Sequence, residues 1–288
     1  MDENTKKAIE AAKKGTKIPV EEVVPTAVVP PKKTTKKKEA VEETPKLFTT
    51  PVLKEDEVIL GEGGKKVKIT EWTGKTRKRL KSLVMSLQGG QEVNFEEFLK
   101  ILINEHIDKK DIYLSADEQQ YLLTRLYQLS ISNEVKGNAN CPVCGEENEV
   151  LIDLPRDVLY TPSKYPLVWE DFPYHGGVEF VDIGTFTELK KTIEGVKKSP
   201  NYDGYSDDSD IEIAMHIHFM GASDILTNIG IIDSLPMQAY NEVMQKFFEV
   251  SPDFKIVVKN RPCQSCHNTV DFTIPEMPDI LTEFMGAS

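Results

Sequence analysis

The chain has 288 residues, a net charge of −12 and an isoelectric point near 5.0. This acidic balance argues against a general nucleic-acid binder, because such a protein needs a basic face to displace counterions from phosphates. No apolar run approaches the ~20 residues that cross a membrane. The sequence also lacks a nucleophile elbow, a glycine-rich cofactor loop and a His-Glu-x-x-His motif. We therefore expect a non-enzymatic protein with no nucleic-acid, membrane or small-molecule partner.

Residues 1–46 differ in composition from the rest of the chain. They contain 11 lysines against 8 aspartates and glutamates, which leaves this segment at +3 and the remainder at −15. Five prolines interrupt the segment, and no aromatic residue precedes Phe48. Such a segment cannot bury enough apolar area to offset its ordering entropy. It is predicted to be a basic arm that is either disordered or ordered by a partner.

Residues 47–135 are predicted to form a β-hairpin and a helical bundle. Two short apolar runs flank a glycine turn at residues 61–64, as in a hairpin. Three segments then place apolar residues at helical spacing. The helices and their signals are Leu80 to Leu87, then Phe95 to Leu102 after the N-cap Asn94, and Leu122 to Leu129 after a Ser115–Glu118 capping box.

All four cysteines fall in two Cys-x-x-Cys turns, and strand-like residues flank both turns. These are Cys141, Cys144, Cys263 and Cys266. Four thiolates on two rigid turns predict a tetrahedral zinc site with no open position, which makes the site structural. Residues 136–155 and 253–288 are therefore predicted to form a zinc ribbon with these four ligands.

Three other interpretations of the cysteines are weaker. Buried free thiols do not explain why all four fall in matched pairs. The run from Cys263 to His267 fits the Cys-x-x-Cys-His haem attachment pattern, but that chemistry requires export and the N-terminus lacks an apolar signal core. A redox role is disfavoured because pairs joined by a metal would not cycle. The cysteine usage fits a reducing cytosol.

Residues 156–252 are predicted to be a mixed helical segment inserted between the two turns. Residues 156–177 are rich in proline and aromatics, which fits either partner contact or packing on the protein's own core. A strand is expected at Val178–Val181 and a helix at Thr187–Val196. The four aspartates of residues 201–210 lack the order of a calcium loop and indicate a solvated loop.

Residues 211–220 alternate as a strand does, but the apolar pattern continues beyond them. We favour a helix from Asp208 to Asn228, on which His216 and His218 would point apart and would not share a metal. Ser234 is the expected cap of a last helix that has Pro236 in its first turn. The apolar face of that helix is formed by Tyr240, Val243, Met244, Phe247 and Phe248.

These patterns predict an α+β fold: a small helical bundle plus a four-cysteine zinc ribbon with a long, mostly helical insertion between its two knuckles. Within residues 50–288, a lysine-bearing hairpin at Gly64–Ile69 precedes the bundle, and a cysteine turn follows with Glu149 and Asp153 four residues apart. Ile232 to Leu235 come before the last helix, and the second cysteine pair closes the series. This order resembles the baseplate hub subunit and hub assembly protein family of T4-like, contractile-tailed bacteriophages.

The resemblance implies a structural component of the baseplate hub that acts by contact with other hub or tail proteins. It also implies a place in the virion tail after assembly in the host cytoplasm. The family includes assembly factors, so a hub assembly chaperone absent from the mature virion is a second hypothesis. A zinc-ribbon nucleic-acid-binding protein is a third, and the acidic charge speaks against it.

Overall fold

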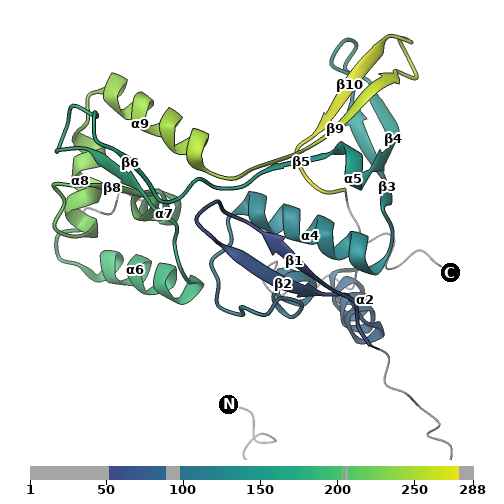
Figure 1. Ribbon diagram of the computed structural model, residues 1–288, viewed down its shortest axis with the longest axis horizontal. Coiled ribbons are helices and arrows are strands. Elements are labelled where there is room, and N and C mark those ends of the chain that lie inside the picture. The colour runs from purple at the N-terminus through teal and green to yellow at the C-terminus, as the bar shows by residue number, and fades with distance from the viewer. Residues whose placement is uncertain (1–51, 89–97, 203, 205–206, 279–288) are drawn as a thin grey trace, which may run out of the picture. The chain divides into compact units, whose positions relative to one another are not determined.

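A computed structural model describes residues 52–88, 98–202, 204 and 207–278 (Figure 1). The predicted arm at residues 1–46 lies outside the described residues. The same is true of Asn94 and Phe95, on which part of the second predicted helix depended.

The N-terminal part of the described chain is a hairpin followed by helices. Strands β1 (Glu55–Ile59) and β2 (Lys66–Thr70) pair antiparallel, which confirms the predicted hairpin. Helix α2 (Gly74–Gln88) and helix α4 (Ala116–Ser130) also form as predicted. The capping box that begins α4 is complete: the Ser115 side chain accepts from Glu118 N–H, and the Glu118 carboxylate accepts from Ser115 N–H.

The second helix differs from the prediction in its described part. Lys100–Asn104 forms η1, a π-helix. Three consecutive residues of η1 are buried, namely Ile101, Leu102 and Ile103. The Trp72 indole N–H donates to the Leu102 carbonyl at 2.7 Å and so anchors this turn inside the core.

Each cysteine pair lies between the strands of its own hairpin. Strand β3 (Glu134–Asn140) pairs with β4 (Glu147–Asp153), and β9 (Asp253–Pro262) pairs with β10 (Thr269–Ile274). Figure 1 shows the two hairpins next to each other. They share one apolar core with β2 and α4. Its members include Ile69, Leu122, Leu126, Ile152, Ile256 and Phe272.

Strand β9 is also paired on its other side. After the one-turn helix α5 (Leu154–Asp157), strand β5 (Val158–Thr161) pairs antiparallel with β9, giving a sheet in the order β10-β9-β5. The sequence pattern assigns residues 158–161 to the inserted segment. They extend the sheet of the second cysteine hairpin instead.

The rest of residues 156–252, the predicted insertion, contains more sheet than predicted. Strands β6 (Leu167–Trp169), β7 (Val178–Phe180) and β8 (Ile217–Phe219) form an antiparallel sheet, of which only β7 was expected. Helices α6 (Phe186–Lys198) and α9 (Met237–Val250) accompany it. The aromatic-rich stretch contributes Tyr165 and Phe172 to a second apolar core. Other members of that core are Val178, Phe180, Ile217, Phe219, Val243 and Phe247.

The helix expected from Asp208 to Asn228 is wrong. Helix α7 (Asp208–His216) ends at His216, β8 follows, and α8 (Ile225–Ser234) begins after a turn. The start of α7 lies within the expected aspartate loop, because Asp207 and Asp210 form its capping box. The alternation of apolar residues from 211 onward therefore belongs partly to a real strand.

Asn228 provides the physical reason for this break. Its side chain is fully buried, and its amide nitrogen donates to the carbonyls of Ala214 and Ile217. Its side-chain oxygen accepts from Phe219 N–H at 2.9 Å. The backbone groups that a continuous helix would have paired internally are thus paired by one side chain on α8.

The start of the last helix also differs from the prediction. Ser234 is the final residue of α8 and donates to the Ile231 carbonyl, and the N-cap of α9 is Pro236. Phe247 is buried as expected, but Phe248 is 66% exposed.

Replacing Asn228 with alanine tests this account of the break. The change leaves two carbonyls and one N–H buried without their partner, so we expect a loss of about 3 kcal/mol in the free energy of unfolding. Urea denaturation of Asn228→Ala against the parent protein measures it. The exposed Asn201→Ala should change stability by less than about 0.5 kcal/mol. Equal stability of the two variants would contradict the assignment.

Candidate functional site

The two cysteine turns have the same backbone geometry. In each, the first cysteine donates its N–H to the carbonyl five residues later, from Cys141 to Glu146 and from Cys263 to Asn268. In each, the residue four positions after the first cysteine donates back to its carbonyl. That residue has a left-handed backbone, with φ of 77° at Gly145 and 59° at His267. Two chain segments far apart in sequence therefore form one kind of turn.

The turns bring the four predicted sulfur ligands together. The Sγ atoms of Cys141 and Cys266 lie 3.8 Å apart, and those of Cys144 and Cys263 lie 3.6 Å apart. All four sulfurs lie within 4.8 Å of one another. Four sulfurs around zinc at 2.3 Å form a tetrahedron with edges of about 3.8 Å. The arrangement therefore fits one tetrahedral ion shared by both hairpins.

Nearby polar groups favour thiolates in this cluster. The N–H of Val143 donates to Cys141 Sγ at 3.4 Å, and the Asn268 side chain donates to Cys266 Sγ at 3.5 Å. Backbone N–H groups of Cys266 and Ser265 lower the pKa of Cys263 to about 6. The pKa of Cys144 is instead raised to about 12: a backbone hydrogen bond with Glu146 lowers it, but burial and hydrogen bonds with the other three sulfurs outweigh that effect. The N–H groups that donate to these sulfurs favour the thiolate, which is the form that binds a metal.

Asn148 ties the two hairpins together beside the cluster, which the sequence pattern did not reveal. This buried side chain on β4 accepts from Gln264 N–H at 2.7 Å and donates to the Glu146 carbonyl at 2.8 Å. It thereby connects the backbone of one cysteine turn to the other. Such a contact holds the ligands in position independently of any ion.

His216 and His218 do not belong to the cysteine cluster. His216 is buried at the end of α7 with its Nδ1 hydrogen-bonded to the Val181 carbonyl, whereas His218 is exposed on β8. Within the described ranges, the cysteine group is the set of potential ligands that comes close enough to hold a metal. His267, the histidine of the haem-like motif, is exposed and occupies the left-handed position of its turn.

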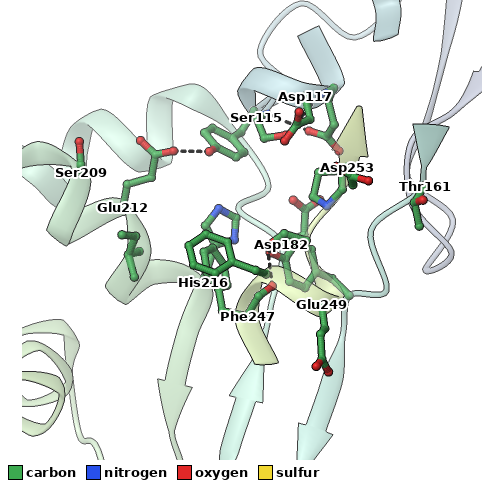
Figure 2. A pocket seen from close by; sticks show the side chains of 17 residues that line it. Ser115, Asp117, Thr161, Asp182, Ser209, Glu212, His216, Phe247, Glu249 and Asp253 are labelled. Carbon is green, nitrogen blue, oxygen red and sulfur yellow. Dashed lines mark hydrogen bonds between the residues drawn. The ribbon is translucent and has the colours of Figure 1, made fainter. Parts of the chain in front are cut away.

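A second candidate site, which the sequence did not predict, is a cleft of about 600 Å³. Its walls include the start of α4, helix α7 and the end of α9. The connection from α9 to β9 and the first residue of β9 also line it. Figure 2 shows Glu212 and His216 extending from α7 into this region, with Asp182 nearby. Its carboxylates are Asp117, Glu118, Asp182, Glu212, Glu249 and Asp253.

A buried ammonium group pairs with two of these carboxylates. Lys65, from the β1–β2 turn, donates to Glu118 on α4 and to Asp182 after β7, each at 2.9 Å. Burial raises the pKa of Glu118, and the charge of Lys65 counteracts that effect. Burial also raises the pKa of Tyr113, whose hydroxyl donates to Glu212, so this tyrosine is neutral.

The comparisons with known proteins assign the chain to a family. A family model described as T4 bacteriophage base plate protein matches residues 54–282. The chain belongs to this baseplate protein family. No curated protein and no solved structure matched it. The matched range includes both cysteine hairpins and the whole segment between them.

The family match confirms the predicted resemblance as far as a T4-like baseplate protein. It supports a structural role in a phage baseplate and association with other phage tail proteins. In the described part of this baseplate protein, no helix is both long and apolar enough to cross a membrane.

Replacing Lys65 tests the buried ion group. Lys65→Met leaves Glu118 buried without its counter-charge, and we expect a loss of about 3–5 kcal/mol at neutral pH. The neighbouring Lys66→Met breaks only an exposed pair with Glu57 and should cost less than about 1 kcal/mol. Urea denaturation compares the two variants.

The loss in Lys65→Met should also depend on pH. A carboxyl whose folded-state pKa is raised stabilises the fold below its unfolded pKa, and that stability is lost as pH rises through the folded pKa. The variant should therefore be closer to the parent protein at pH 5 than at pH 7.5. A loss that grows toward acid pH would contradict this assignment.

Proposed function

We propose that the protein is a structural component of the baseplate hub in a contractile phage tail and that a zinc ion joins its two cysteine hairpins. The family match over residues 54–282 carries the baseplate role. The proposal adds two features to it: the hub as the place in the baseplate, and zinc as the metal. The hub rests on the order of motifs described from the sequence.

The chemistry of the cluster supports a structural metal rather than a catalytic one. Zinc in structural sites takes four protein ligands, whereas catalytic sites keep one position for water or substrate. Four cysteine sulfurs at tetrahedral spacing would fill every position. The ion would then act by holding two hairpins that 118 residues separate in sequence.

A nucleic-acid-binding zinc ribbon is the less favoured alternative. Binding to a phosphate backbone needs clustered Lys and Arg, and the chain outside residues 1–46 has a net charge of −15. A structural subunit that works by protein contact is consistent with this charge and with the family.

The metal assignment predicts about one zinc ion per purified chain. Elemental analysis of the purified protein should find it, and Cys263→Ser should lose most of it because one of four ligands is missing. Ser265→Ala, in the same turn, should keep the metal. Acidification should release the ion, because protons compete for the thiolates. A metal-free parent protein, or full zinc retention in Cys263→Ser, would refute the zinc proposal.

The place of the protein is tested in purified particles. Quantitative mass spectrometry of mature virions and of isolated baseplates should find the protein in both at a fixed copy number. A hub assembly factor would instead be present in assembly intermediates and missing from virions. That second outcome would replace the structural-subunit proposal with the assembly-factor hypothesis.

A further inference from the structure

The cleft between α4, α7 and the end of α9 contains unsatisfied acceptor atoms. Glu118 is only 1% exposed, and its Oε2 accepts both from Lys65 and from Ser115 N–H. Its other oxygen, Oε1, has no partner in the described part of the chain. Glu118 is one of the residues that line the cleft.

His216 contributes a second acceptor of this kind. It is 6% exposed, and its Nδ1 lies 2.8 Å from the Val181 carbonyl. A ring nitrogen that faces a carbonyl must donate, so the neutral ring presents Nε2 as a bare acceptor. Burial lowers the pKa of His216 and so favours the neutral ring. Within the described residues Nε2 has no partner.

The charges around the cleft point to a cationic ligand. Lys65 neutralises one of the two carboxylates that it contacts, Glu118 or Asp182. At the rim, Glu249 and Asp253 pair with exposed lysines. Asp117 and Glu212 also line the cleft, and no lysine or arginine in the described ranges forms a salt bridge with either. A ligand that fills the cleft must supply hydrogen-bond donors and positive charge.

The walls of the cleft suit a side chain with an apolar stem. Tyr113, Tyr165 and Phe247 line the cleft, and so does the exposed Phe248. Lysine and arginine pack their methylene stems on such surfaces while the charged end meets carboxylates and aromatic faces. A volume of about 600 Å³ is larger than one such side chain needs, so neighbouring residues of a peptide also fit.

We propose that this cleft binds a lysine or arginine side chain on an extended segment of a protein partner. The inference goes beyond the proposed function, because it concerns a different surface from the cysteine cluster. It holds for a virion subunit and for an assembly factor alike. Its test uses isolated protein and is therefore independent of the particle experiments.

The probe is a fluorescent, end-blocked peptide, Ala-Lys-Ala-Lys-Ala, whose binding to the full chain is measured by anisotropy at 50 mM salt. The double variant Asp117→Asn with Glu212→Gln removes the two carboxylates that lack a cation and keeps their shapes. It should bind the peptide at least tenfold more weakly than the parent protein. The control Asp171→Asn with Glu242→Gln removes the same charge from exposed sites outside the cleft and should change affinity less than twofold.

Three outcomes would overturn the proposal. An equal loss in both double variants means general attraction to an acidic surface. Equal binding of a peptide with glutamines in place of its lysines means that charge is not recognised. A free alkyl diamine that binds as tightly as the peptide means a small-amine site rather than a peptide site.

A second measurement covers the case in which the cleft variant does not fold. Carbodiimide coupling joins the lysine peptide directly to carboxylates of the parent protein, and mass spectrometry then locates the linked residues. Links concentrated at Glu212, Asp117 and the rim residue Glu249 are expected. Links spread over the acidic surface without enrichment at the cleft would overturn the proposal.

Discussion

Hydrogen bonding on both sides of β9 is the constraint on which the rest of the fold depends. On one side β9 pairs with β10 and forms the second cysteine hairpin. On the other side it pairs with β5, through which the chain enters the segment between the cysteine pairs. The segment between β5 and β9 therefore begins and ends at two strands that are neighbours in one sheet. Such a segment can carry its own apolar core without separating the turns.

Side chains then connect this sheet to the helices. Phe254 and Ile256 of β9 are buried in the core that contains α4, and Phe254 N–H donates to Asp117 at the start of that helix. Tyr160 of β5 stacks on Tyr121 of α4, with ring centroids 3.9 Å apart, and its hydroxyl donates to the Leu60 carbonyl. The hairpin, the bundle and the cysteine turns are thus parts of one packed structure, although sequence patterns divide them.

Local signals predicted those parts of the fold that local chemistry decides. The capping box at Ser115 and the apolar spacing of α4 identified that helix, and the paired Cys-x-x-Cys motifs identified the sulfurs that come together. The end of α7 was missed, because a buried amide twelve residues further along the chain, on Asn228, determines it. The apolar alternation of residues 211–220 was ambiguous because this short stretch contains both the end of helix α7 and strand β8.

The cleft was unpredictable for a related reason. Its carboxylates come from segments up to 136 residues apart, from Asp117 to Asp253, and each alone resembles an ordinary surface residue of an acidic protein. Asn148 is a similar case, since a single asparagine in a strand gives no sign that it will bind the opposite turn. Long-range pairing of polar groups leaves no periodic trace in a sequence.

The cleft and the cysteine cluster place opposite demands on the chain. Four sulfurs that share an ion would be satisfied within the protein, so the cluster has nothing left to offer a partner. Lys65 contacts two carboxylates of the cleft with one charge, and one acceptor atom each on Glu118 and His216 has no donor in the described part of the chain. The folded state would be more stable with one carboxylate for each cation, because an uncompensated buried charge is destabilising. A subunit that acts by contact can maintain such an imbalance when a partner's cation relieves it, which connects the internal electrostatics of this protein to its assembly.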